Sequence, residues 1–155
     1  MPVHKRYFGA ALAVALVTAG CGTQTVQMQP PETDGQTAEA CAALVADLPD
    51  ALLGADRATV QPESEIMAAW GDPPIGLRCG VPRPSTLNME SELLEVNDVA
   101  WFGQPEDEPT LYTAVEREAY VEVTIPPSHG VPAEALPALS DLIDEHLEER
   151  ADSGM

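Results

Sequence analysis

The stretch AAWGDPPIGLRCGVPRP, residues 68–84, carries the strongest structural signal in the sequence. Its apolar residues alternate with Gly and Arg and so fall on one side of an extended chain: Ile75, Leu77, Cys79 and Val81. This period of two is typical of a half-buried β-strand. Prolines lie on both sides of the alternating run, and they limit it because proline cannot donate to a strand ladder. The stretch therefore predicts a strand over residues 75–81 with Cys79 directed into the core.

A second cysteine belongs to a predicted helix over residues 38–48. The apolar residues of this segment repeat at helical spacing: Cys41, Leu44, Val45 and Leu48. Thr37 is placed to cap the first turn, and Pro49 ends the helix. Because Cys41 then points inward, a helix packed across the strand at residues 75–81 would bring the two sulfurs together.

The first twenty residues have the features of an export signal. Residues 4–6 are basic, and residues 7–18 are mostly apolar but too few to cross about 30 Å of hydrocarbon. Small residues then lead directly into Cys21, an arrangement that resembles a bacterial lipobox, in which the cysteine thiol receives a diacylglyceryl group. The alternative is cleavage near Ala19 or Gly20 by an ordinary signal peptidase, which would release a soluble protein.

These signals predict four parts along the chain. We expect a lipoprotein signal peptide over residues 1–20 and a lipidated Cys21 followed by a flexible tether through residue 36. A single folded domain then covers residues 37–150, and residues 151–155 form a disordered tail. The expected location is the outer face of the cytoplasmic membrane, with the membrane itself as a partner through the lipid anchor.

Lipidation of Cys21 would leave Cys41 and Cys79 as a pair in a compartment that permits disulfides. A bond between them would close a loop of about 40 residues and stabilise the fold by about 4 kcal/mol on the chain-entropy model. A catalytic thiol or a metal-binding pair is the alternative. Neither cysteine has a histidine next to it in sequence, so we predict the disulfide and no metal site.

Further elements follow from alternation and turn residues. A short strand is expected over residues 57–61, and residues 63–70 are expected to form a helical turn. Apolar pairs around Asn97-Asp98 predict a hairpin, and the alternating runs at residues 111–115 and 121–125 predict a second one.

A C-terminal helix is expected over residues 133–150, with its apolar stripe formed by Leu136, Leu139, Ile143 and Leu147. The predicted fold class is α+β: an antiparallel sheet of about four or five strands, covered by N- and C-terminal helices, with one disulfide.

The charge balance excludes one class of partner. The 155 residues carry 7 Lys+Arg against 26 Asp+Glu, a formal net charge of -19. Lys is absent after Lys5, and the polyanion offers no basic patch for a phosphate backbone, so we expect no nucleic acid partner.

The central motif, together with residues 91–102 and 112–126, resembles a family of secreted or lipid-anchored proteins from high-GC Gram-positive bacteria, classed as domain of unknown function 3515. The resemblance covers roughly residues 41–147. Its markers are Cys41, Trp70, Gly71, Pro73, Arg78, Cys79, Gly80, Pro82, Trp101 and Arg117. The chain departs from the family at Asp98, where glycine is preferred. The resemblance implies an exported disulfide-bonded fold and carries over no biochemical activity or cofactor.

Five residue positions are candidates for binding. Arg78 and Arg117, with Arg83, could form a pocket for a carboxylate or phosphate; the alternative is that each anchors a structural contact. Trp70 and Trp101 could line a ligand groove or pack in the core.

Asp72 lies within the distinctive motif, where it could serve acid–base chemistry or accept turn hydrogen bonds. No serine lies in a hydrolase motif and no nucleotide-binding glycine pattern occurs, so we predict no catalytic residues and no cofactor.

The function predicted from these observations is that of a cell-envelope lipoprotein with a non-enzymatic binding domain. Its partners would be envelope proteins or cell-wall components. The alternative is an enzyme or accessory factor of cell-wall metabolism that acts on an anionic substrate through Asp72 or the arginines. A small-ligand carrier with a deep apolar pocket is a third possibility.

Overall fold

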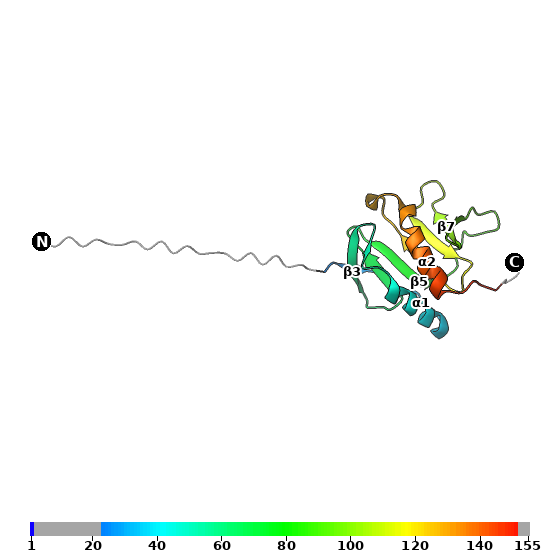
Figure 1. The fold of residues 1–155 in the computed structure, drawn as a ribbon, viewed down its shortest axis with the longest axis horizontal. Coiled ribbons are helices and arrows are strands. Elements are labelled where there is room, and N and C mark those ends of the chain that lie inside the picture. The colour runs from blue at the N-terminus through cyan, green and yellow to red at the C-terminus, as the bar shows by residue number, and fades with distance from the viewer. Residues whose placement is uncertain (2–22, 152–155) are drawn as a thin grey trace.

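The computed structural model describes Met1 and residues 23–151, in which two α-helices lie on one face of a twisted sheet (Figure 1). The predictions for the signal peptide, for Cys21 and for residues 152–155 lie outside the described residues. The helices are α1 (Gly35–Asp47) and α2 (Leu136–His146), with 3-10 turns at Pro127–His129 and Pro132–Glu134. Neither α-helix is long and apolar enough to cross a membrane.

Nine strands occur in the described part of the chain. Their bounds are β1 Thr25–Gln27, β2 Ala51–Leu52, β3 Ala55–Gln61, β4 Met67–Trp70, β5 Ile75–Val81, β6 Leu94–Val96, β7 Val99–Gln104, β8 Leu111–Val115 and β9 Tyr120–Thr124. The sheet order is β1-β3-β4-β5-β9-β8-β7-β6, and β2 pairs with β3 beside this path. All pairs are antiparallel except β1 with β3, so the sheet is mixed but largely antiparallel.

The main core lies between the sheet and the two helices. The predicted C-terminal stripe is confirmed, since all four of its residues are fully buried: Leu136, Leu139, Ile143 and Leu147. They pack with the inward residues of β5, among them Ile75 and Leu77. A smaller cluster on the opposite face of the sheet joins Val26, Val60 and Met67.

The predicted disulfide is confirmed. Cys41 on α1 and Cys79 on β5 are both fully buried, and they are bonded with their Cα atoms 5.5 Å apart. The bond fixes the N-terminal helix across the middle of the sheet, as the two apolar periodicities indicate. The first turn of α1 is capped by Asp34 rather than by Thr37: the Thr37 amide donates to the Asp34 carboxylate at 2.9 Å. That backbone hydrogen bond lowers the pKa of Asp34.

The structure differs from the predicted tether from residue 25 onward. Residues Thr25–Gln27 form the edge strand β1, which pairs in parallel with Thr59–Gln61 of β3. Val26 is 7% exposed and packs with Val60. One buried residue in a polar three-residue strand leaves no periodicity to detect, because the pairing depends on a distant strand. The domain therefore begins about ten residues earlier than predicted.

The sheet also has more strands than the four or five predicted. The helical turn expected over residues 63–70 is wrong, because Met67–Trp70 is a strand buried on both faces. A short apolar run of this kind fits a helix or a central strand equally well by periodicity. The hairpin at Asn97-Asp98 is confirmed, and positive φ angles of 46° and 61° at these residues give it a tight turn.

The C-terminal helix is shorter than predicted and ends at His146. The chain then runs beside the β8–β9 turn, where the Glu118 amide donates to the Glu148 carbonyl and the Arg150 amide to the Glu116 carbonyl. These backbone bonds replace the last helical turn and bring residues 148–151 to the outer face of the sheet.

Candidate functional site

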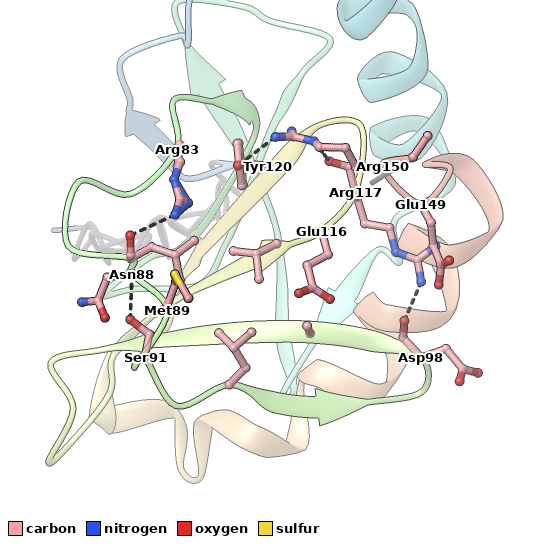
Figure 2. A pocket seen from close by; sticks show the side chains of 15 residues that line it. Arg83, Asn88, Met89, Ser91, Asp98, Glu116, Arg117, Tyr120, Glu149 and Arg150 are labelled. Carbon is pink, nitrogen blue, oxygen red and sulfur yellow. Dashed lines mark hydrogen bonds between the residues drawn. The ribbon is translucent and has the colours of Figure 1, made fainter. Parts of the chain in front are cut away.

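The face of the sheet opposite the helices carries an open groove of about 1020 Å³ (Figure 2). Its base includes Ala100 of β7 and Val115 of β8, which are register partners. Tyr120, at the start of β9, also lines it. The neighbouring residues Val99 and Ala114 point into the core, so side-chain alternation directs this set outward.

One wall of the groove is the loop that connects β5 to β6, residues 82–93. Pro82 and Pro84 follow β5 directly and prevent the chain from continuing as a ladder strand. A turn then forms in which the Asn88 amide donates to the Ser91 hydroxyl at 3.0 Å. The loop presents apolar side chains at the groove, and two of them are among the most exposed large apolar residues described: Met89 (77%) and Leu93 (39%).

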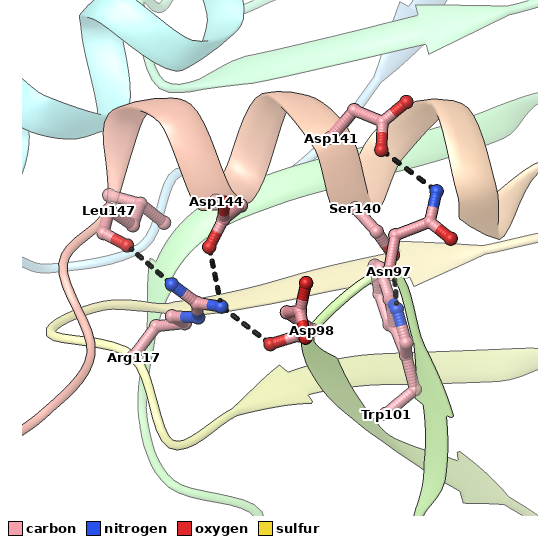
Figure 3. Close-up of polar contacts among 8 residues, drawn as sticks. All are labelled: Asn97, Asp98, Trp101, Arg117, Ser140, Asp141, Asp144 and Leu147. Atoms are coloured by element: carbon pink, nitrogen blue, oxygen red, sulfur yellow. Dashed lines mark hydrogen bonds and ion pairs between the residues drawn. The ribbon is translucent and has the colours of Figure 1, made fainter.

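The opposite end of the groove is held by Arg117, which is only 3% exposed (Figure 3). Its guanidinium donates to the Leu147 carbonyl at 3.2 Å and to the Asp98 carbonyl at 2.6 Å, and it pairs with the Asp144 carboxylate at 2.9 Å. Arg117 thus joins three segments: the β8–β9 turn, the β6–β7 hairpin and α2. Its donors and its charge are engaged within the protein.

Two further arginines line the groove in a different state. Arg150 stacks over the Tyr120 ring, 4.6 Å from its centroid, and donates to the Tyr120 hydroxyl at 2.9 Å. Arg83 donates from Nη2 to the Leu87 carbonyl at 3.0 Å. Among the residues that the structure describes, neither guanidinium forms an ion pair with a carboxylate, in a protein with far more acids than bases.

Three carboxylates also line this groove: Asp98, Glu116 and Glu149. All three residues are exposed, and none takes part in an ion pair within the described chain. Figure 2 shows Glu116 between the loop wall and the Arg117 end. The lining therefore combines an equal number of guanidinium and carboxylate groups with an apolar base.

Of the arginines expected to share a pocket, Arg83 and Arg117 line the groove and Arg78 does not. Arg78 lies on β5 opposite Glu122 of β9, and its Nε donates to the Glu122 carboxylate at 2.9 Å. Its Nη1 also donates to the Gln29 carbonyl at 3.3 Å, which attaches the N-terminal segment to the sheet. Arg78 is a structural cross-strand partner in this arrangement.

The structure places both tryptophans in the core and not at an open surface. Trp70 and Trp101 are fully buried, each with its indole N–H donating at 2.9 Å, to the Pro49 carbonyl and to the Ser140 hydroxyl respectively. Arg57 stacks over Trp70. Asp72 lies in the exposed turn between β4 and β5 and is not part of the groove.

Several groove residues could not be recognised in the sequence: Met89, Leu93, Tyr120 and Arg150. The first two belong to a loop without periodicity, and the last was assigned to a helix that ends earlier. The only available signal was that two bulky apolar residues lie in an otherwise polar loop. Within residues 23–151, no group of three or more His, Cys, Asp or Glu residues is arranged to hold a metal ion.

Fold and groove together define a small disulfide-bonded α+β domain with an open, mixed-charge groove on the free face of its sheet. The chain belongs to the family described as protein of unknown function (DUF3515), whose model matches residues 7–151. No curated protein and no solved structure matches the chain.

Proposed function

We propose that the protein is a lipoprotein of the cell envelope whose domain is a non-enzymatic binding module, fastened through Cys21 to the outer face of the cytoplasmic membrane. The basic and apolar leader and the small residues before Cys21 support the anchor. The buried Cys41–Cys79 bond fits an oxidising compartment outside the cytosol. The observation that carries the binding role is the groove, where apolar side chains and unpaired guanidinium groups share one open surface.

The position of β1 gives this proposal an orientation. Cys21 precedes Thr25 by four residues, which reach at most about 14 Å, so the β1 edge of the sheet would lie next to the bilayer. The groove involves β7, β8 and β9, towards the other edge in the strand order. With about 4.8 Å between neighbouring strands, β7 lies on the order of 30 Å from β1. The anchored domain would thus present its groove away from the membrane, towards envelope partners (Figure 1).

An enzymatic role through Asp72 and the arginines receives no support from the geometry. Asp72 lies in an exposed turn outside the groove, and Arg78 is paired with Glu122 on the sheet. A catalytic pair needs its groups within hydrogen-bond reach of one substrate position, which this arrangement does not provide.

Site-specific photocrosslinking in living cells tests the binding role. A photoreactive amino acid is placed at Met89 in the groove or, as a matched control, at Val131, an apolar residue that is 56% exposed outside it. We expect a discrete adduct from position 89 that is absent from position 131 and is lost when Arg83→Gln is added. Identical adducts from both positions, or none from position 89, would contradict a binding role for the groove.

A further inference from the structure

The charges around the groove are balanced, although the whole chain is strongly acidic. Three arginines line it, Arg83, Arg117 and Arg150, and three carboxylates face them. The formal charge of the lining is therefore zero in a chain whose net charge is -19. A polyanionic ligand such as a polyphosphate would meet three carboxylates, and a second copy of this acidic chain would bring further like charges, including Glu90, Glu92 and Glu95 next to β6.

The positive and negative groups have different capacities left for a ligand. Arg83 has five N–H donors and uses one of them, on the Leu87 carbonyl. The Tyr120 hydroxyl accepts from Arg150, so its own proton is free to be donated. Since Arg117 is neutralised by Asp144, it does not compensate Glu116 or Glu149. The loop side of the groove thus offers donors for an anion, and its far end offers carboxylates for a cation.

Apolar contacts lie between these two polar regions. Val115 is nearly buried in the base, and Leu93 and Met89 are exposed on the loop wall. An apolar side chain that covered them would remove their surface from water, at about 25 cal/mol for each Å². A ligand that satisfies all three regions carries a carboxylate, an ammonium group and an apolar side chain within a short span.

From this complementarity we infer that the groove binds a short zwitterionic peptide. Its carboxylate accepts hydrogen bonds from Arg83 and the Tyr120 hydroxyl, and its apolar side chain packs on Leu93 and Val115. Its ammonium group lies between Glu116 and Glu149. This assignment rests on the proposed binding function and adds the chemical class of the ligand. Figure 2 shows Arg83 and Glu149 at opposite ends of the groove, as such a ligand requires.

Selection from a display library of random short peptides tests the assignment, with the full chain in detergent micelles as the target. We expect enrichment, relative to the unselected library, of peptides that combine an acidic group, a basic group and an apolar residue. Enrichment should be lost on the Arg83→Gln chain. No enrichment, enrichment of purely acidic peptides, or equal enrichment on the Arg83→Gln chain would overturn the inference.

Calorimetry with the most enriched peptide then separates a specific contact from general attraction. Replacing the peptide's carboxylate by an amide and introducing Arg83→Gln should each weaken binding at least about tenfold, and together little more than either alone. Fully additive losses would contradict direct contact. Leu93→Asp should also abolish binding, whereas Val131→Asp should leave it unchanged; each variant is checked for an unchanged melting temperature.

The two proposals can fail separately. Groove-specific crosslinks in cells without peptide enrichment would leave the binding module intact and remove the peptide ligand. Enriched peptides whose binding does not depend on Arg83 or Leu93 would likewise place the ligand outside the groove.

Discussion

Replacing Cys41 and Cys79 together by alanine is expected to lower the free energy of unfolding by about 4 kcal/mol. The native bond spans 38 positions in sequence, so its removal returns a large loop-closure entropy to the unfolded chain. Both cysteines are fully buried, and the bond is the covalent link between α1 and the middle of the sheet. Urea denaturation of the oxidised chain, the reduced chain and the double variant measures the effect.

Two controls isolate the contribution of the bond. Reduction of the unmutated chain should give nearly the same loss as the double variant, because it breaks the bond without changing any other side chain. Replacing Cys21 by alanine should leave the denaturation midpoint unchanged. An oxidised chain and a reduced chain with the same midpoint would show that the bond does not stabilise this fold.

The second large effect is expected at Trp101. Truncation to alanine should cost about 3–5 kcal/mol, because it opens a cavity in the core and leaves the Ser140 hydroxyl without its indole donor. The side chain is fully buried, and its Nε1 lies 2.9 Å from Ser140 Oγ on α2. Thermal or urea unfolding of the variant provides the measurement.

Trp101→Phe is the matched control, since it retains an aromatic ring and loses the N–H donor. We expect a loss of about 1–3 kcal/mol for this variant, smaller than for alanine. A tryptophan that lined an open ligand site would tolerate both changes with a loss of about 0.5 kcal/mol or less. Such a small loss from the alanine variant would therefore return Trp101 to the list of ligand-binding residues.

The elements that the sequence predicted well are those with a strong local pattern. Four alternating apolar residues identified β5, the Asn97-Asp98 turn identified a hairpin, and the helical stripe ending at Leu147 identified α2. In each case the local preference and the tertiary packing favour the same structure, so one stretch of sequence carries enough information. The Cys41–Cys79 pair followed from two such patterns together.

The missed elements depend on contacts between distant segments. β1 is a strand only because β3 accepts it as an edge partner, and β4 is buried on both faces, which removes the alternation. The end of α2 is set by backbone bonds to the β8–β9 turn, which no local propensity encodes. These long-range pairings account for the low predicted strand count and for the misplaced tether.

The same reason explains the partial success at the groove. Arg117 stood out because arginines are few, but the sequence could not show that three segments converge on its guanidinium. The loop wall over residues 82–93 has no secondary structure pattern apart from its prolines. Its side chains form a site only because the loop folds over β7 and β8, and that arrangement is a property of the tertiary structure.

The measurement that tests the central claim most directly is the intact mass of the protein extracted from cell membranes without reducing agent. The account predicts a chain that begins at Cys21, carries the mass of attached acyl chains on that residue, and lacks one pair of hydrogens because Cys41 and Cys79 are joined. A chain that retains residues 1–20, bears no acyl group and has free thiols at both positions would contradict it.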